Sequence, residues 1–458
     1  MDKELEDVLR VVARKHFWAF CCYYDYEFYH EKRRFLKQVA LMFNDVVKAY
    51  EDGRAMKVGV SMPPRAGKSY ITTLFAAYWL GRFNDLSVMR CCCTGTLYDQ
   101  FSYNTRAVVK SERYRSVFPE VRLVQDKKSL GGWSVEGAKQ VSYFGAGVGG
   151  SIIGFGANLA ISDDLFTGMR DALSTTVKNS VKMWKTSEFN SRMERNCPEV
   201  FIGTRWVKDD VLGDAIEAGL DQYIKIPALV DEVSFCEDVK TTEEYLKIRE
   251  SERIGENDSA TWLAEYMQEP ADVVGTLLPR ESLLFDAIPS DESQCVLRFA
   301  VGDPANKGGD KYACVFLWVY AHIDSVTVYV VDALCNTDGI LANTPRIAQM
   351  CCDYNIDRIM IEENGLGLAA YYEIARALEG QRTKIIPFTS RVNKEVRILS
   401  YFEFIARYFV FRSQGTKEYN QFISDLTSYN KGGDNKHRQD AIDVLSTAAQ
   451  AVKERYVL

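Results

Sequence analysis

One segment, residues 55–83, constrains the fold of this chain more than any other. It reads AMKVGVSMPPRAGKSYITTLFAAYWLGRF: Val58 and Val60 alternate with small residues, and an apolar face at helical spacing begins at Ser69. This pattern predicts a strand, a tight loop and a helix, in that order. Because the amide groups of a helix N-terminus bind phosphate, the order is typical of a phosphate-binding loop.

The centre of this loop carries the residues expected to grip a nucleotide: Pro64, Arg65, Ala66, Gly67, Lys68 and Ser69. We expect the amides from Ala66 to Ser69 to face a β-phosphate, Lys68 to reach the β- and γ-phosphate oxygens, and the Ser69 hydroxyl to ligate Mg²⁺. Met62 stands where the motif usually has its first glycine. An ordinary surface turn is the alternative, because a Gly-Lys-Ser triplet is common by chance.

A second apolar run, residues 159–161, leads into Asp163 and Asp164. A phosphate loop needs a carboxylate at the end of a neighbouring strand, so we expect Asp163 to hold the Mg²⁺ shell and Asp164 to polarise the attacking water. The glycines repeated between positions 145 and 156 predict tight backbone geometry directly before these acids. A strand that ends in a solvated turn is the alternative.

A third strand pattern begins at Phe201 and runs into GTRW, followed by two further acids, Asp209 and Asp210. Together, MPPRAGKS, GGSIIGFGANLAISDD and GTRW-x-x-DD resemble the motor half of tailed-bacteriophage terminase large subunits, the ATPases that pump DNA into procapsids. The resemblance implies that Met62 is a permitted replacement, that Arg65 contacts phosphate, and that Thr204 couples hydrolysis to movement. Without the resemblance, Arg65 reads as a solvated charge and Thr204 as a strand-end hydroxyl.

The C-terminal third predicts a different fold. Residues 295–334 read as three strands, a helical stretch leads to a strand at 358–361, and a last helix opens at residue 439. Acids end the first and fourth strands and share one face of the last helix: Asp303, Glu362, Glu363, Asp440 and Asp443. This order of three strands, helix, strand, helix, strand and helix resembles the ribonuclease H-like nucleases.

Carboxylates that converge from distant segments repel one another unless cations neutralise them, and two-metal phosphodiester cleavage is built on that arrangement. GDPANKGGD, IEENG and HRQDAID are each similar to the nuclease half of terminases, which cuts concatemeric DNA into genome lengths. By that resemblance Asp303, Glu362 and Asp440 ligate Mg²⁺ or Mn²⁺. Glu363 and Asp443 stay open as ligands, and each acid alone also reads as a turn, strand-end or helix-cap residue.

Length and composition favour two domains, since 458 residues, 47% of them hydrophobic and 26% charged, exceed one ordinary core. We predict an α/β protein with an ATPase domain at 1–230, whose mainly parallel sheet is flanked by helices. A junction at 231–290 follows, and a ribonuclease H-like nuclease domain at 291–458 completes the chain.

The net charge of −7 argues against indiscriminate coating of DNA, because non-specific affinity comes from phosphate neutralisation by Lys and Arg. DNA contact is therefore expected to be local. The candidate basic patches are Arg113 with Arg115, Lys127 with Lys128, and Arg391 with Lys394 and Arg397. The arginine that acts in trans between subunits stays open among Arg106, Arg113 and Arg115.

Three remaining features concern the core and the compartment. The twelve cysteines lack the spacing of metal ligands and read as buried hydrophobes in a reducing cytosol. The aromatic-rich segment 16–49 reads as core, with an adenine-stacking ring or Gln38 as the alternative. Residues 1–10 are acidic and polar and no apolar run is long enough to span a membrane, so we expect a soluble protein of the host cytoplasm, associated with the procapsid during packaging and not in the mature virion.

The resemblance extends from about Phe35 to Ala449 and implies a set of cofactors and partners. They are ATP and Mg²⁺, with Mn²⁺ possible at the nuclease site, double-stranded DNA, a portal protein, a small terminase subunit, and a homo-oligomeric ring on the procapsid. Two other classes stay open: a repair or helicase-type ATPase fused to a nuclease, and a non-catalytic docking protein with relic folds.

Overall fold

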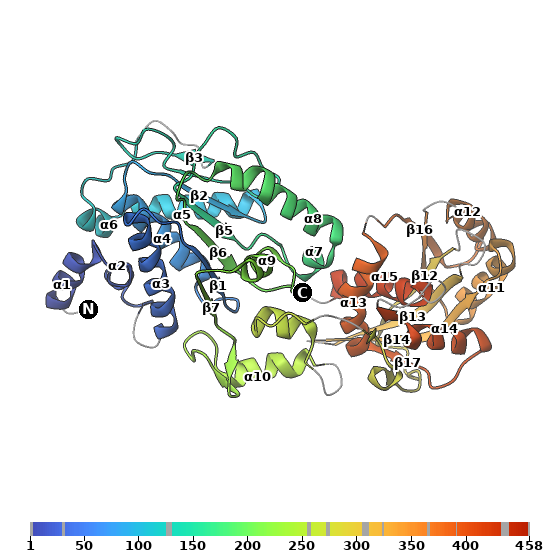
Figure 1. The fold of residues 1–458 in the computed structure, drawn as a ribbon. Helices are drawn as coiled ribbons and strands as arrows, with labels where there is room; N and C mark the ends of the chain where they lie inside the picture. Colours follow the sequence, from blue (N-terminus) through green and yellow to red (C-terminus); the bar gives the residue numbers. More distant parts are fainter. Residues whose placement is uncertain are drawn as a thin grey trace. The chain divides into compact units, whose positions relative to one another are not determined.

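The computed structural model describes residues 3–29, 33–124, 131–253, 258–271, 275–304, 311–322, 325–363, 367–390, 392–431 and 439–456. The chain divides into two units (Figure 1). The first comprises Met1–Glu252 with Asp258–Asp272, and the second comprises Val273–Leu458 with Arg253–Asn257. The segment expected as a junction, 231–290, is thus divided between the units.

The first unit is built on a mainly parallel sheet. Over the described residues its seven strands lie in the order β3-β4-β2-β5-β6-β1-β7. Their bounds are β1 (Lys57–Ser61), β2 (Val88–Cys92), β3 (Gly132–Trp133), β4 (Tyr143–Phe144), β5 (Leu159–Asp163), β6 (Glu199–Gly203) and β7 (Gln222–Lys225). β3 pairs antiparallel with β4, and the other neighbours pair parallel. Because β6 lies between β1 and β5, the three sequence motifs meet at the carboxyl ends of adjacent strands.

Helices cover both faces of this sheet. One face packs against α2 (Phe17–Tyr24), α3 (Arg34–Glu51), α4 (Lys68–Arg82) and α5 (Gly95–Lys110), and the other against α8 (Thr175–Trp184) and α9 (Val211–Ala218) (Figure 1). The first unit also contains α1 (Lys3–Ala13), α6 (Glu112–Val117), α7 (Met169–Leu173), a π-helix η2 (Lys185–Phe189) and a 3₁₀ turn η3 (Asn190–Arg192). Cys91 joins one core and Cys92 the other, because successive residues of a strand point to opposite faces.

Aromatic residues from the segment 16–49 form the centre of the first core. Phe17 and Phe20 are fully buried, and the ring of Phe43 lies 4.4 Å from that of Phe75 on α4. Gln38 is exposed. These positions agree with the interpretation of the segment as core.

The first unit also includes the part of the chain that follows residue 230. The elements there are β8 (Leu229–Val230), β9 (Val233–Ser234), α10 (Thr242–Ser251) and a π-helix η4 (Trp262–Tyr266). α10 opens with a capping box, in which Thr241 and Glu244 exchange side-chain and backbone hydrogen bonds. Tyr245 and Trp262 are both buried and belong to the same small, separate core.

The second unit has a mixed sheet whose strands, over the described residues, lie in the order β11-β17-β14-β13-β12-β15-β16. Their bounds are β11 (Leu284–Phe285), β12 (Cys295–Asp303), β13 (Tyr312–Ala321), β14 (Val326–Asn336), β15 (Arg358–Glu362), β16 (Lys384–Phe388) and β17 (Phe409–Phe411), and β10 (Gly275–Thr276) pairs separately with β18 (Asn430–Lys431). β12, β13 and β14 form an antiparallel meander, whereas β15 pairs parallel with β12 and β16. The predicted ribonuclease H-like order of strands is confirmed.

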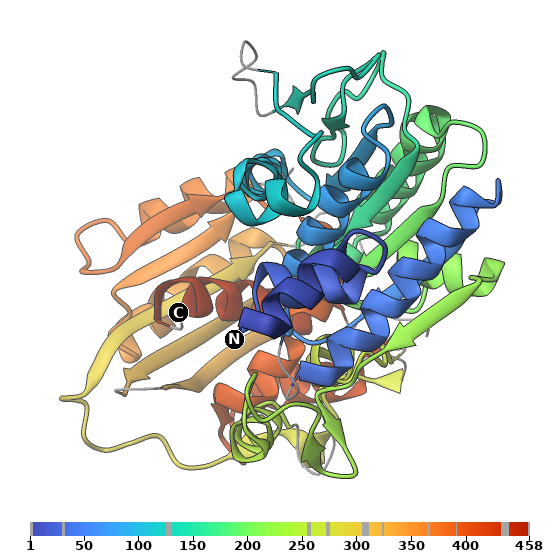
Figure 2. The same cartoon turned by 90° about the vertical axis from the view of Figure 1, so that its left-hand side faces the viewer.

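Helices also flank the second sheet. α11 (Ile340–Asp353) and α12 (Gly367–Ala377) share a core with β13, while α13 (Lys394–Tyr408), α14 (Lys417–Ser428) and α15 (Gln439–Tyr456) complete the unit. α15 packs on β12, β13 and α13, and Figure 2 shows it in dark red across the yellow strands. No described helix is both long and apolar enough to cross a bilayer.

The cysteines follow the expectation with three corrections. All twelve lie within the described residues and are free thiols. Nine of them are buried, as expected, but Cys93 and Cys295 are half-buried and Cys352 is exposed. The difference between Cys351 and Cys352 follows from helix geometry, since consecutive residues at the end of α11 point in directions about 100° apart.

Candidate functional site

The loop between β1 and α4 has the backbone that a phosphate-binding loop requires. Arg65 and Gly67 adopt left-handed conformations, with φ of 64° and 100°. A Cβ atom at Gly67 would lie 3.0 Å from the ring of Phe28, so both the conformation and the packing call for glycine there. Lys68 is the first residue of α4, and the unpaired amides of this helix end follow directly.

Lys68 folds back over the carboxyl ends of the strands. Its Nζ donates to the carbonyl of Met62 at 3.0 Å and to Oγ1 of Thr204 at 2.7 Å, and it lies 3.7 Å from Oδ2 of Asp164. Only 9% of Lys68 is exposed. Since Met62 contributes its backbone carbonyl to this contact, the identity of its side chain does not affect the contact.

Asp163 ends β5 at the centre of the sheet and is fully buried. Its Oδ2 accepts a hydrogen bond from Nε of Arg90 at 2.9 Å and is also contacted by Nη2 of Arg90. Burial raises the pKa of Asp163, and the charge of Arg90 opposes that rise. Within the described part of the chain, Oδ1 of Asp163 has no hydrogen-bond partner. This buried carboxylate oxygen, beside the loop between β1 and α4, would fit a Mg²⁺ shell shared with Ser69, because Mg²⁺ prefers oxygen ligands.

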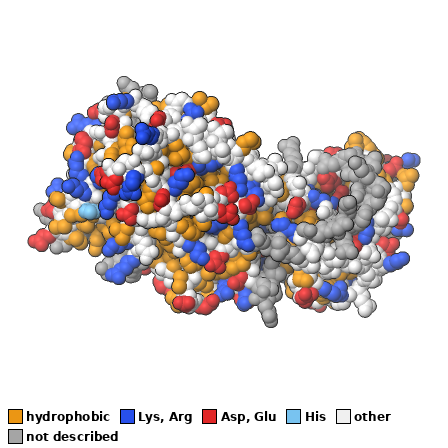
Figure 3. Space-filling model, viewed as in Figure 1, with side chains coloured by type: hydrophobic (Ala, Val, Ile, Leu, Met, Phe, Trp, Pro, Cys, Tyr) orange, Lys and Arg blue, Asp and Glu red, His pale blue; other side chains and the backbone are white. Residues whose placement is uncertain are grey.

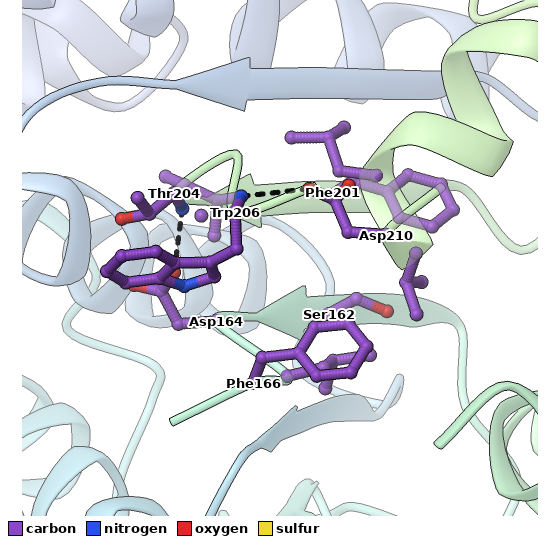
Figure 4. Close-up of a pocket in the computed structure, with 12 residues that line it drawn as sticks. Ser162, Asp164, Phe166, Phe201, Thr204, Trp206 and Asp210 are labelled. Carbon is purple, nitrogen blue, oxygen red and sulfur yellow. Dashed lines mark hydrogen bonds between the residues drawn. The ribbon is translucent and has the colours of Figure 1, made fainter. Parts of the chain in front are cut away.

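Asp164 follows directly and is held in a strained backbone conformation, with φ of 46°. Its Oδ1 accepts the amide of Thr204 at 2.7 Å, a bond drawn as a dashed line in Figure 4. A Cβ atom at Gly203 would lie 2.8 Å from this oxygen, so the last residue of β6 must be glycine for Asp164 to sit where it does. Thr204 therefore contacts Lys68 through its hydroxyl and Asp164 through its amide.

The turn after β6 is ordered by Asp210. Its Oδ1 accepts the amide of Gly213 at 2.7 Å and caps α9, and its Oδ2 accepts the amide of Trp206 at 3.1 Å (Figure 4). Nε of Arg205 lies 3.1 Å from both carboxylate oxygens. A cavity of about 30 Å³, lined by Asp164, Thr204 and Trp206 among others, adjoins the turn. Asp210 thus shapes the backbone that presents Thr204.

Sequence reasoning missed one acid near this site. Glu265 lies on η4, in the part of the chain expected as a junction. Burial and the charge of Glu252 raise its pKa, and Lys68 and Asp164 also act on it electrostatically. Gln268 joins this segment to the strand ends, because its Oε1 accepts the amide of Arg205 at 3.3 Å and its Nε2 donates to the carbonyl of Glu265 at 2.6 Å. A lone acid inside the apolar run WLAEYM was the available signal.

In the second unit, acids predicted from two distant segments approach one lysine, and an acid from a third segment ends the strand beside them. Asp303 ends β12, Glu362 ends the adjacent parallel strand β15, and Asp440 lies in the first turn of α15. Nζ of Lys394, the first residue of α13, lies 2.7 Å from Oδ1 of Asp440 and 3.7 Å from Oδ2 of Asp303. The same Nζ lies 3.3 Å from Oδ2 of Asp443.

The electrostatics of this group are those of crowded acids. Burial raises the pKa of Asp303 to about 7; Lys394 opposes the rise, and the charges of Asp443, Glu362 and Asp440 add to it. The pKa of Lys394 is raised by the carboxylates although burial acts against its charge. Among the described residues, no three His, Cys, Asp or Glu side chains form a ready metal site. The lysine thus neutralises charge that a divalent cation would neutralise, and the donor set of carboxylates fits Mg²⁺ or Mn²⁺.

The structure separates the roles of Asp440 and Asp443. Asp443 is 2% exposed, and Arg397 donates to both of its oxygens, each at 2.8 Å. Oδ1 of Asp440 instead accepts a hydrogen bond from Nζ of Lys394, and its Oδ2 accepts one from the backbone amide of Lys311 at 3.2 Å. One partner of Asp440, the side chain of Lys394, is therefore a cation that a metal ion can displace, whereas Asp443 is fixed in a buried pair with Arg397.

The expected basic patches need correction. Arg397 is 4% exposed and bound to Asp443, so it offers no surface to DNA, and Lys394 is engaged with the acids. Arg113 donates to the carbonyls of Tyr23 and Tyr24. Arg115 is exposed and Arg106 half-buried, while Lys127, Lys128 and Arg391 lie outside the described residues. On the coloured part of the face in Figure 3, basic and acidic side chains mingle.

Comparison with known proteins identifies the fold. Neither the family models nor the curated proteins yield a match to this chain. Two crystal structures of the large terminase from the thermophilic bacteriophage D6E match it with TM-scores of 0.51 and 0.50, each at 9% identity. They cover 88% and 92% of this chain and 95% and 98% of their own. The HK97 bacteriophage large terminase covers 90% of this chain at 11% identity, with a TM-score of 0.36. The two D6E matches show that the chain has the fold of phage large terminases.

Proposed function

We propose that the chain is a terminase large subunit that hydrolyses ATP to move double-stranded DNA into procapsids and cuts concatemeric DNA with a metal-dependent nuclease. One observation carries the proposal: two chemically different carboxylate groups, one beside a phosphate loop and one around Lys394, occupy separate units of a terminase fold. A relic docking protein would have no reason to keep both.

In the proposed motor, the amides at the start of α4 and the Nζ of Lys68 bind the phosphate oxygens of ATP, with Arg65 at the mouth of the loop. Mg²⁺, when held by Ser69 and Asp163, would supply charge neutralisation of the transferring phosphoryl group. In this proposal Asp164 orients the attacking water. Thr204 contacts both Lys68 and Asp164, so a change of phosphate state reaches the turn after β6.

In the proposed nuclease, Asp303, Glu362 and Asp440 would hold divalent metal, which supplies a nucleophile and stabilises the leaving oxygen. Lys394 must give up its contact with Asp440 when these ligands are used. Asp443 keeps α15 in register through Arg397. Glu363, at the end of β15, remains a further candidate ligand.

The proposal includes the partners that the function requires. These are double-stranded DNA, a portal protein, a small terminase subunit and further copies of the chain in a ring on the procapsid, in the host cytoplasm. The arginine that acts in trans is proposed to come from among Arg106, Arg113 and Arg115, with Arg113 disfavoured by its contacts to Tyr23 and Tyr24.

A pair of variants tests the proposal. Lys68→Ala should lower ATP turnover roughly a hundredfold or more while DNA cutting in Mn²⁺ persists, because the two sites share no residue. Asp303→Asn should do the reverse. If either variant lost both activities while folded, or lost neither, the assignment of two independent sites would be wrong. Strand separation of blunt duplex by the wild type would instead favour the helicase-type alternative.

A further inference from the structure

Arg90 is an arginine buried in the middle of a strand. It lies on β2 between β4 and β5 and is 0% exposed. The guanidinium carbon lies 3.8 Å from the centre of the Phe101 ring. A buried guanidinium is costly unless its donors are paired, so its contacts indicate what it is there to hold.

Those contacts join the two elements that carry the proposed Mg²⁺ ligands. On the β5 side, Nε and Nη2 of Arg90 donate to Oδ2 of Asp163. On the α4 side, Nη1 donates to Oγ1 of Thr73 at 2.9 Å, and Nη2 donates to the carbonyl of Ser69 at 3.3 Å. One planar group therefore spans from the backbone of Ser69 to the carboxylate of Asp163.

The side of the carboxylate that Arg90 uses is equally informative. Both of its bonds to Asp163 go to Oδ2, and Oδ1 has no hydrogen-bond partner among the described residues. A guanidinium placed for neutralisation alone would favour the bidentate arrangement that Arg397 makes with both oxygens of Asp443. The one-sided contact fixes the carboxylate plane and leaves one oxygen available.

We propose that Arg90 is a positioning residue that sets the spacing between Ser69 and Asp163 and presents Oδ1 of Asp163 to the metal of the bound nucleotide. The inference rests on the proposed ATPase function and adds to it a residue that no part of the phosphate-loop pattern contains. Arg90 touches neither nucleotide nor metal in this role, and it acts through the two ligands.

The test compares nucleotide binding with and without metal in the full-length protein. A fluorescent ADP analogue is titrated in EDTA and again in Mg²⁺, and the ratio of the two dissociation constants measures how much the metal contributes. Mn²⁺ titrations followed by electron paramagnetic resonance, in the presence of ADP, give the metal affinity directly. A role confined to folding would change both dissociation constants together and leave their ratio unchanged.

Arg90→Lys keeps the charge but cannot reach both elements. We expect the contribution of metal to fall about tenfold or more, as is usual when a partner of a metal ligand is removed, with binding in EDTA unchanged. Lys185→Met is the control for disruption of a buried ion pair, since Lys185 pairs with Glu199 on β6 of the same sheet. It should lower stability and leave the ratio as in the wild type.

A second pair of variants keeps the test decisive if Arg90→Lys does not fold. Thr73→Val removes the hydroxyl that accepts a hydrogen bond from Arg90. Thr72→Val removes a neighbouring hydroxyl that donates to the carbonyl of Lys68 instead. Both threonines are buried in α4. Thr73→Val should lower the contribution of metal about threefold or more, and Thr72→Val should not.

The outcomes separate cleanly. Equal ratios of the dissociation constants for Thr73→Val, Thr72→Val and wild type would overturn the role of Arg90 while the ATPase proposal stands. A nucleotide affinity of Arg90→Lys that falls by the same factor in EDTA and in Mg²⁺ would do the same. A wild type whose nucleotide affinity does not depend on metal would overturn the proposed function, and this inference with it.

Discussion

The two units of the chain hold their acidic residues in opposite ways. In the first unit each acid has its own partner: Arg90 binds Asp163, and the amide of Thr204 binds Asp164. In the second unit Asp303, Asp440 and Asp443 all approach one side chain, Lys394. Partners that are backbone amides or buried guanidinium groups stay in place when ligands bind. A single shared lysine is a cation that another cation can replace.

This difference separates a preorganised site from an exchangeable one. Preorganised dipoles and charges need no rearrangement at the moment of reaction, which would suit the proposed ATPase. A group of acids held by a lysine stays neutralised until metal and substrate arrive, which would suit the proposed nuclease. Four predictions test the contrast, beginning with the largest expected effect.

The buried pair in the second unit should be worth the most. Arg397→Met leaves Asp443 charged, buried and without its bidentate partner, so we expect a loss of about 3–5 kcal/mol in the free energy of unfolding. Denaturant unfolding measures it. Arg346→Met, which removes an exposed pair with Asp338, is the control and should change stability by less than about 1 kcal/mol. A similar small change for both variants would mean that the pair does not anchor α15.

The shared lysine should compete with metal. Lys394→Met leaves Asp303 and Asp440 without their common cation, so the metal-free protein should melt at a lower temperature and bind Mn²⁺ about tenfold more tightly. Calorimetric titration checks the affinity. Lys417→Met, which changes an exposed lysine of the same unit, should alter neither quantity. Unchanged or weaker Mn²⁺ binding in Lys394→Met would contradict the view of an exchangeable site.

The proposed ATP site should tolerate an added methyl group poorly. Gly203→Ala places a methyl group 2.8 Å from Oδ1 of Asp164, so this carboxylate must shift away from Thr204. We expect ATP turnover to fall about tenfold, with nucleotide affinity nearly unchanged. Gly95→Ala adds a methyl group into open space in the same unit and serves as the control. Full turnover in Gly203→Ala would show that the position of Asp164 is adjustable after all.

The smallest effect is expected from separating the units. A fragment from Gly275 to Leu458 keeps β10 and β11, which pair with β18 and β17, so its unfolding free energy should match that of the second unit in the full chain within about 1 kcal/mol. It should also cut DNA without ATP. A fragment from Ser290 lacks both strands and should be less stable. Equal stability of the two fragments would show that these short strands contribute nothing.

The sequence predicted the elements and the acids because both follow from local patterns. Alternating strands, a Gly-Lys-Ser loop and acids at strand ends are legible within a few residues, and the order of strands in the second unit is confirmed. Sequence analysis missed Arg90 because its partner Asp163 lies 73 residues away. It missed Glu265 because this residue lies in the segment expected as a junction, far in sequence from the groups that act on it. Arg397 was misread as surface because a helix in isolation does not reveal which face will be covered.

Several contacts of the proposed ATP site are made by the main chain rather than by side chains. Lys68 binds the carbonyl of Met62, and Asp164 binds the amide of Thr204. No ordinary substitution at Met62 deletes its carbonyl, and at Thr204 only proline would delete the amide. The side chains of such a site can change while its backbone hydrogen bonds remain. A chain that shares 9% of its residues with another can therefore have the same fold, because contacts of this kind tolerate changes of side chain.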